Sequence, residues 1–277
     1  MPFGFLRERA SCVPSRRRHA GWRVLLRGAA VGLVFLRAPD GLARPLAGLA
    51  AGRVLVSGPA HPRATLVMLP GGAGDVGIRP DGTVRHGANF VVRTRALWAA
   101  RGYAVVLADA PDDMTLRGVR STPAYADRVA ALVRLARERF GAPVFLLGTS
   151  QGSIAAMNGA AHAPPGTLAG VILSEPVSVL GGSHETVFDA DPEGVRVPVL
   201  IVVNRDDRCP VAPPGAAAAI RAALSASPDV SVLSVSGGRD EDGTPCGSLS
   251  PHGYAGIETP VVDGIGRWVL SRLAARQ

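Results

Sequence analysis

Ser150 stands between two glycines directly after an apolar run, and this pattern carries the clearest chemistry in the sequence. Residues 143–152 read Pro-Val-Phe-Leu-Leu-Gly-Thr-Ser-Gln-Gly, and small helix-compatible residues follow. A serine on a tight strand-to-helix turn exposes its hydroxyl, and side chains at Gly148 and Gly152 would collide with the neighbouring strand and helix. The pattern predicts a nucleophile elbow with Ser150 as the nucleophile. An ordinary glycine-rich turn with an exposed serine is the alternative.

A nucleophilic serine needs a general base and an acid that orients this base. The apolar run Val197–Val203 is followed by Asn-Arg-Asp-Asp-Arg-Cys-Pro, which places two aspartates at a strand end, where open α/β sheets carry their sites. We predict Asp207 as the acid, with Asp206 as the alternative. His252, in the loop Ser-Pro-His-Gly-Tyr before the last predicted helix, is the predicted base.

Backbone N–H groups are the predicted donors to the oxyanion that forms during acyl transfer. One is that of Gln151, directly after the nucleophile, and the other belongs to Gly72 or Ala73 in the loop Leu-Pro-Gly-Gly-Ala-Gly-Asp. This loop also has the Gly-X-Gly-X-X-Gly spacing of dinucleotide sites. No helical pattern follows it and no acidic residue stands about 20 residues further on, so no cofactor is predicted.

Other polar residues are interpreted as structural. Asp109 is interpreted as a turn residue and Glu258 as a charge at a helix N-terminus. The remaining histidines of the predicted domain show no metal-ligand spacing, and no metal site is predicted. These histidines are His61, His86, His162 and His184.

Seven apolar runs rich in β-branched residues recur along the chain, with helical patterns between them. Several are continuous rather than alternating, which is typical of strands buried on both faces of a parallel sheet. The predicted strands are Arg53–Val56, Thr65–Leu69, Tyr103–Ala108, Val144–Leu147, Val171–Leu173, Val197–Val203 and Val230–Val235. The predicted helices are Val92–Arg101, Ala124–Phe140, Ser153–Ala161, Gly215–Ser225 and Val261–Ala275.

The predicted fold class is therefore α/β, with a doubly wound, mostly parallel sheet flanked by helices. About 20 residues, Ser174–Arg196, separate the strand after the elbow helix from the next strand. This is too short for a sizeable cap domain, so we expect a rather open site.

Residues 1–43 resemble a targeting segment, and residues 44–277 are predicted to form a single domain. The segment has an arginine-rich start, an apolar stretch from Gly28 to Leu36 and small residues beyond it. Export to the periplasm or the medium is the prediction. Because Arg37 interrupts a short apolar core, a retained signal anchor or a reading frame that starts too far upstream are the alternatives. No later stretch approaches the roughly 18 consecutive apolar residues of a membrane span.

The net charge of +8 is concentrated in this first segment. Eight of the 30 basic residues lie in residues 1–43 against two acidic ones, which leaves residues 44–277 with 22 basic and 20 acidic residues. A domain with so small a net charge has no electrostatic footprint for a phosphate backbone, so no nucleic-acid partner is predicted.

Two cysteines, Cys209 and Cys246, lie in the predicted domain, beside the predicted acid and base. An even number of cysteines in an exported domain favours a disulfide, and two unrelated buried thiols are the alternative. A bridge would close a loop of about 40 residues, worth about 3–4 kcal/mol in chain entropy.

From residue 53 to its end the chain resembles the α/β-hydrolase superfamily, and more narrowly a group of exported bacterial α/β hydrolases of undefined substrate. The resemblance is carried by Pro-Gly-Gly-Ala-Gly, Gly-Thr-Ser-Gln-Gly, Arg-Asp-Asp-Arg-Cys and His-Gly-Tyr-Ala-Gly-Ile-Glu. It implies Ser150 as nucleophile, Asp207 as acid and His252 as base, in that superfamily's chain order, and a Cys209–Cys246 disulfide. Asn204 departs from the histidine expected in many relatives.

These residues predict a serine hydrolase that acts by acyl transfer, most favourably on carboxylic esters, with a small-molecule ester or related acyl compound as substrate. Esters need less help for the leaving group than amides do, so an amidase or serine peptidase is the second expectation. A non-catalytic ligand-binding protein on a hydrolase scaffold is the alternative from another class. A serine, an acid and a histidine in three suitable loops argue against it.

Overall fold

The computed structural model describes residues 43–45, 52–111 and 114–275, all within one compact unit, Pro39–Gln277. Residues 1–42, and with them almost all of the predicted targeting segment, lie outside the described residues. Among the residues that are described, no helix combines the length and apolar character needed to cross a bilayer.

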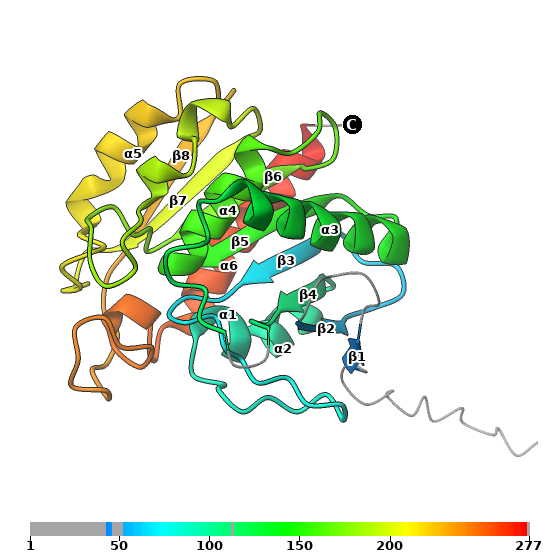
Figure 1. Ribbon diagram of the computed structural model, residues 1–277, viewed down its shortest axis with the longest axis horizontal. Helices are drawn as coiled ribbons and strands as arrows, with labels where there is room; N and C mark the ends of the chain where they lie inside the picture. Colours follow the sequence, from blue (N-terminus) through cyan, green and yellow to red (C-terminus); the bar gives the residue numbers. More distant parts are fainter. Residues whose placement is uncertain (1–42, 46–51, 112–113, 276–277) are drawn as a thin grey trace, which may run out of the picture. The chain divides into compact units, whose positions relative to one another are not determined.

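An eight-stranded sheet forms the centre of this unit (Figure 1). Its order is β1-β2-β4-β3-β5-β6-β7-β8, in which β1 and β2 run antiparallel to their neighbours and the other strands pair in parallel. The strands are β1 (Ala43–Pro45), β2 (Arg53–Ser57), β3 (Thr65–Leu69), β4 (Ala104–Ala108), β5 (Val144–Thr149), β6 (Gly170–Ser174), β7 (Val199–Asn204) and β8 (Val230–Val235). Every residue of β3, β4, β5, β6 and β7 is buried, as their continuous apolar sequences predict.

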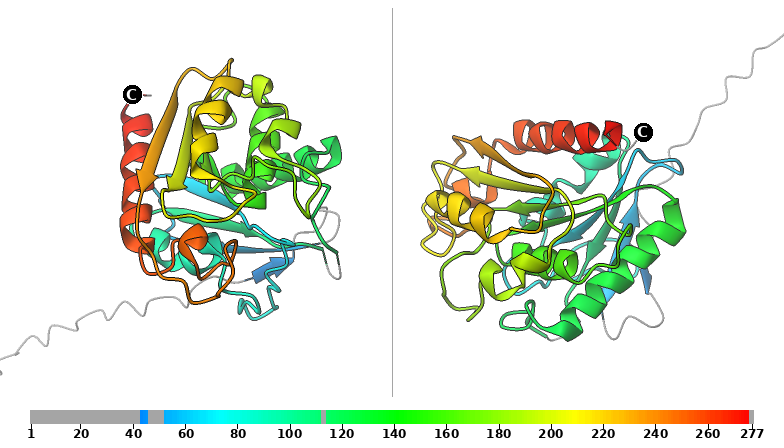
Figure 2. Two further views of the ribbon diagram at one scale, coloured as in Figure 1. Left: turned by 90° about the vertical axis from the view of Figure 1, so that its left-hand side faces the viewer. Right: turned by 90° about the horizontal axis from the view of Figure 1, so that it is seen from above.

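Helices cover both faces of the sheet, as Figure 2 shows from two sides. The helices are α1 (Phe90–Arg93), α2 (Arg95–Ala100), α3 (Pro123–Phe140), α4 (Gln151–Ala161), α5 (Ala217–Ala223) and α6 (Glu258–Ala274). Helices α3, α4 and α5 pack on one face and α1, α2 and α6 on the other. Two separate hydrophobic clusters result, one for each face, and the predicted α/β class with a mostly parallel sheet is confirmed.

The strand register brings the candidate chemistry to one edge of the sheet. Leu69 pairs with Gly148, Thr149 with Ser174, and Ser174 with Val202, so β3, β5, β6 and β7 all end at the same edge. The chain leaves each strand there into a loop. The carboxyl ends of parallel strands are where open α/β sheets place their sites.

The structure differs from the sequence-based prediction in two elements. The predicted helix Val92–Arg101 is two short helices, because the chain breaks at Thr94, whose hydroxyl donates to the Phe90 carbonyl at 2.7 Å. Strand β1 is additional. The connection from β6 to β7 holds only two single-turn helices, Val187–Asp189 and Pro192–Gly194, so the expected absence of a sizeable cap is confirmed.

Candidate active site

Ser150 occupies a strained turn between β5 and α4. Its φ of +55° and ψ of −126° lie outside the regions that side-chain-bearing residues favour, at a cost of about 1–3 kcal/mol. A Cβ added to Gly148 would stand 2.1 Å from the Gly152 carbonyl oxygen, and one added to Gly152 would stand 2.0 Å from that of Leu69. The backbones of β3, the turn and α4 are therefore too close for any side chain at either glycine, as the sequence pattern predicts.

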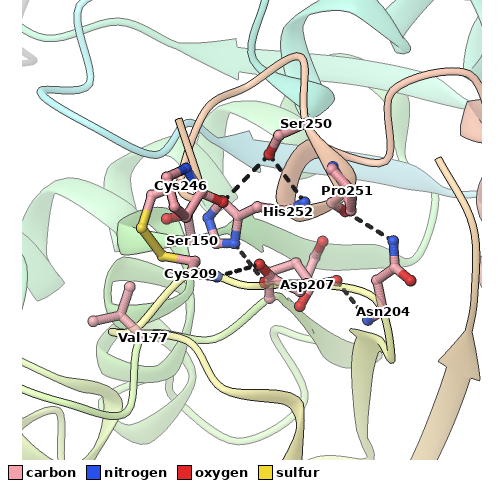
Figure 3. Close-up of polar contacts among 12 residues, drawn as sticks. Ser150, Val177, Asn204, Asp207, Cys209, Cys246, Ser250, Pro251 and His252 are labelled. Atoms are coloured by element: carbon pink, nitrogen blue, oxygen red, sulfur yellow. Dashed lines mark hydrogen bonds and ion pairs between the residues drawn. A yellow bond between two sulfur atoms is a disulfide. The ribbon is translucent and has the colours of Figure 1, made fainter. Parts of the chain in front are cut away.

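His252 and Asp207 form a buried pair. The His252 Nδ1 lies 2.7 Å from Asp207 Oδ2, and the two side chains are 3% and 0% exposed (Figure 3). The other carboxylate oxygen of Asp207 accepts the N–H of Cys209 at 2.8 Å. Asp206, the alternative acid, is exposed and accepts the N–H of Gly237. The structure thus pairs His252 with Asp207 and not with Asp206.

A disulfide between Cys209 and Cys246 links the loop that carries Asp207 to the loop that carries His252. Cys209 is buried, and it is the residue whose N–H donates to Asp207. On the histidine side, Ser250 Oγ donates to the Gly247 carbonyl at 2.8 Å and accepts the N–H of His252. The covalent bond therefore acts on both members of the buried pair.

Two side chains that the sequence analysis did not assign to the site also hold the histidine loop. Asn204 Nδ2 donates to the carbonyls of Pro251 and Gly237, at 2.9 and 2.8 Å, and so fastens the end of β7 to this loop. Arg93, at the end of α1, donates to the carbonyls of Ser248 and Gly253 and pairs with Glu258 at 2.9 Å.

The predicted oxyanion loop, residues 69–75, lies directly against the elbow. A Cβ on Gly71 would stand 3.0 Å from Ser150 Cβ, so this backbone lies directly against Ser150. Gly72 has a φ of +59°, and Ala73 accepts the N–H of Leu116 through its carbonyl. Helix α4 begins at Gln151, directly after Ser150, so the N–H of Gln151 lies at the first position of the helix. The three predicted donors thus stand on two backbone segments that meet at the serine.

Arg120, which the sequence analysis missed, connects those two segments. It is fully buried, and its guanidinium donates to the carbonyls of Pro70 and Gly72 at 3.2 and 2.9 Å. It also donates to the Gln151 side chain at 3.3 Å. No sequence signal marks it, because the chain offers 30 arginines without a motif around this one.

Asp109 fixes the continuation of the oxyanion loop rather than taking part in the buried pair. Its carboxylate accepts the N–H groups of Val76, Gly77 and Ile78. The segment continues into a bridge between Ile78 and Val84. His61, His86, His162 and His184 are all exposed.

One nitrogen at the centre of the site is left without a partner. His252 Nε2 is buried and has no hydrogen bond to any described residue, Ser150 included. This is the ring nitrogen that would accept the proton of a nucleophile, since Nδ1 is engaged with Asp207. Catalytic hydrogen bonds are often long before substrate binds, so the missing bond to Ser150 does not by itself exclude His252 as a base.

Glu175, directly after β6, also lies in this cluster. Side-chain atoms of Glu175, Asp207 and His252 stand within 4.8 Å of one another, a spacing at which such groups sometimes hold a metal ion. Within this cluster His252 is paired with Asp207, and Glu175 accepts the N–H of Asn204 at 2.7 Å.

A cavity of about 190 Å³ opens beside the oxyanion loop. It is lined by residues 70–76 together with His86, Ala88, Asn89, Val92 and Ser248, and so lies between the oxyanion loop and the histidine loop. A larger cavity of about 730 Å³ shares Ala73 and Asp75 with it and is otherwise lined by residues outside the site.

Comparison with known proteins gives one curated sequence relative and many structural ones. No family model matches the chain. The chain is 35% identical to the phospholipase YtpA of Bacillus subtilis strain 168 over 105 residues, which cover 36% of this chain and 40% of the relative. The match thus spans well under half of that protein.

Similar solved structures cover most of the chain at low identity. A dienelactone hydrolase from Anabaena variabilis aligns with a TM-score of 0.58 at 17% identity, over 84% of this chain and 98% of its own. A thermostable carboxyl esterase from Bacillus coagulans gives 0.57 at 13%, over 84% and 98%. A lidless α/β serine hydrolase from Xanthomonas campestris gives 0.56 at 15%, over 84% and 97%. The chain has the α/β-hydrolase fold, as the sequence predicts.

Proposed function

We propose that this protein is a serine hydrolase that cleaves small carboxylic esters by acyl transfer. The observation that carries the proposal is the buried 2.7 Å pair of His252 and Asp207 in loops at the strand edge where a strained turn presents Ser150. The kinship in fold with esterases, and the partial match to a phospholipase, support the same reaction class.

The proposed reaction follows from the contact between His252 Nδ1 and the Asp207 carboxylate. Asp207 holds His252 with Nδ1 as the donor, so that Nε2 is free to accept the Ser150 proton as Oγ attacks the ester carbonyl carbon. The imidazolium then gives this proton to the leaving alcohol. A water molecule, deprotonated by the same nitrogen, attacks the acyl-enzyme and releases the acid.

The N–H groups of Gln151 and of Gly72 or Ala73 are proposed to stabilise the negative oxygen of each tetrahedral intermediate. Arg120 is proposed to fix the two segments that carry these donors, because its guanidinium donates to the Pro70 and Gly72 carbonyls and to the Gln151 side chain. Donors that are fixed before reaction cost no reorganisation when the charge develops.

A small acyl group is proposed on the cavity that borders the oxyanion loop, which is lined by Gly72, Ala73 and Ser248 and not by Ser150 or His252. Its volume of about 190 Å³ is below the roughly 300–1,000 Å³ of pockets for drug-sized ligands, and the fold places no cap above it. We expect acetate and butyrate esters to be cleaved faster than esters of long-chain acids. An amide substrate remains the second candidate, since the same residues would serve it.

The Cys209–Cys246 disulfide is the basis for proposing that the protein is exported, because disulfides persist in oxidising compartments and are rare in the cytosol. The targeting role of residues 1–43 belongs to this proposal. Mass spectrometry of the N-terminus of protein recovered from the periplasm or medium tests it, and an uncleaved chain recovered only from cytosol would contradict it.

Hydrolysis of p-nitrophenyl acetate, butyrate and octanoate by wild type, Ser150→Ala and Ser153→Ala tests the reaction. Ser153 is the matched control, since it lies in the same helix and its hydroxyl is bound to the Ser150 carbonyl and the Val177 N–H. We expect a loss of about 10³-fold or more in kcat/KM for Ser150→Ala, and a far smaller one for Ser153→Ala. Equal activity of wild type and folded Ser150→Ala would overturn the proposal.

A further inference from the structure

Glu175 is a buried acid that the proposed mechanism does not use. It follows β6 directly, its φ of +43° is in the left-handed region, and it is 0% exposed. Its backbone N–H donates to Val202 at 2.9 Å. One carboxyl oxygen accepts the Asn204 N–H at 2.7 Å, whereas the other, Oε2, is buried and has no hydrogen-bond partner among the described residues. If Glu175 were ionised, the negative charge on Oε2 would have no hydrogen-bond donor and no solvent to stabilise it.

The neighbours of Glu175 oppose its ionisation. Asp207 lies on the loop after β7, with side-chain oxygens of the two acids within 4.8 Å, and its own carboxylate is engaged by His252 Nδ1 and the Cys209 N–H. Tyr254, on the loop before α6, is buried, and its hydroxyl accepts a hydrogen bond from Ser174 and donates one to the Val202 carbonyl. No cationic side chain of the described residues forms an ion pair with Glu175.

Burial raises the pKa of the Glu175 carboxyl well above its ordinary value, and the negative charge of Asp207 raises it further. The Tyr254 hydroxyl acts in the opposite direction without reversing the shift. Burial also raises the pKa of Tyr254 well above its ordinary value, so this phenol stays neutral as well. Two carboxyl groups so close together in a buried site do not both ionise at once.

We infer that Glu175 is held as a neutral carboxylic acid behind Asp207 and positions the acid-histidine pair by directing its proton toward the Asp207 carboxylate. In this arrangement Asp207 carries the single negative charge of the cluster. A second negative charge beside His252 would stabilise the imidazolium and keep the base protonated to higher pH. The neutral acid thus allows His252 to act as a base near neutral pH while Asp207 stays fixed.

The variant Glu175→Gln separates a neutral acid from an ionised one, because glutamine keeps the shape, one acceptor for the Asn204 N–H and a donor for Asp207, but cannot ionise. Glu185→Gln is the matched control. Glu185 is also buried in the β6–β7 connection, but its carboxylate accepts three hydrogen bonds, from the Gly118 N–H and from the N–H and hydroxyl of Ser121.

Thermal unfolding from pH 4 to pH 9 tests the protonation state without any assay of activity. With a raised pKa in the folded protein, Glu175 binds its proton more tightly there than in the unfolded chain, so wild-type stability falls as pH rises above about 4.3. Glutamine lacks this loss. The Tm of Glu175→Gln should therefore rise relative to wild type with increasing pH. The Tm of Glu185→Gln should fall below that of wild type, since one amide oxygen cannot replace both carboxylate oxygens as acceptors for Gly118 and Ser121.

The pH profile of kcat/KM tests the positioning role, and this half of the inference rests on the proposed function. We expect Glu175→Gln to keep activity within about threefold and its acidic limb within about 0.3 pH unit, and Glu175→Leu, which can neither donate nor accept, to lose about tenfold or more in kcat. An acidic limb of Glu175→Gln that moves down by a unit or more would show an ionised Glu175 and overturn the inference. If Ser150→Ala retains activity, the proposed function fails, while the Tm comparison still decides the protonation state.

Discussion

The nucleophile and the histidine of the candidate site are held by different kinds of structure. Ser150 is fixed by backbone packing, with Gly148 and Gly152 in contact with main-chain atoms of β3 and α4 in the hydrophobic centre of the sheet. His252 stands on a loop, and side chains from distant parts of the chain hold it: the Cys209–Cys246 bond, Asn204 and Arg93. Positions that are set by backbone packing tolerate no substitution. A loop that is held by several side chains should instead lose stability and activity partially each time one of these side chains is removed.

Substitution of Gly152 should cause the largest loss of stability, because this glycine is where the backbone around Ser150 is packed most tightly. In Gly152→Ala the new Cβ meets the Leu69 carbonyl oxygen at 2.0 Å, and neither β3 nor α4 can move away. We expect a loss of more than about 4 kcal/mol, enough to abolish folding of a domain of ordinary stability. Gly215→Ala is the control, since its Cβ would meet nothing within 4 Å. Soluble, cooperatively unfolding Gly152→Ala protein would contradict the packing argument.

Replacement of each aspartate by asparagine tests which of the two, Asp207 or Asp206, acts as the acid of the triad. Asp207→Asn should lower kcat by about 10³–10⁴-fold, because asparagine cannot hold the histidine in the required tautomer or stabilise its charged form. Asp206→Asn, at the surface, should change kcat by less than about threefold. Steady-state kinetics of the two variants, with circular dichroism to verify folding, decides between them. Similar losses in both would remove the distinction between the two acids.

Arg120 belongs to the nucleophile side, although it acts through a side chain. Arg120→Met leaves the Pro70 and Gly72 carbonyls without their buried donor and frees the oxyanion loop. We expect kcat to fall about tenfold or more with a smaller change in KM. The exposed Arg117→Met should be nearly silent. A rise in KM alone would point to substrate binding rather than to oxyanion stabilisation.

Loss of the disulfide should have a graded effect on the histidine side. In the double variant Cys209→Ser/Cys246→Ser we expect a loss of about 3–4 kcal/mol in stability and a several-fold decrease in kcat, because Asn204 and Arg93 still hold the loop. Denaturant unfolding and steady-state kinetics measure both. Titration of the denatured wild type should give no free thiol from these two residues, and two free thiols would contradict the bond.

The same contrast explains what the sequence could predict. The buried strands, the elbow and the pairing of Asp207 with His252 depend on local patterns and on strand-end geometry, and these were visible in the sequence. Arg120, Asn204 and Arg93 act across large sequence separations through bonds to backbone carbonyls, which leave no local pattern. Strand β1 is only three residues long, which is too short to show the apolar pattern that marks a strand in the sequence. Glu175 did carry a signal, since it is an acid at a strand end as Asp207 is.

The proposed hydrolase activity depends most on an activated serine at position 150. Incubation of the purified protein with a fluorophosphonate, followed by intact mass and by peptide mapping, tests this directly. We predict stoichiometric addition of one phosphonyl group at Ser150, absent in Ser150→Ala and strongly slowed in His252→Ala. Folded wild-type protein that stays unlabelled, or label at another serine, would contradict the account and favour a ligand-binding scaffold.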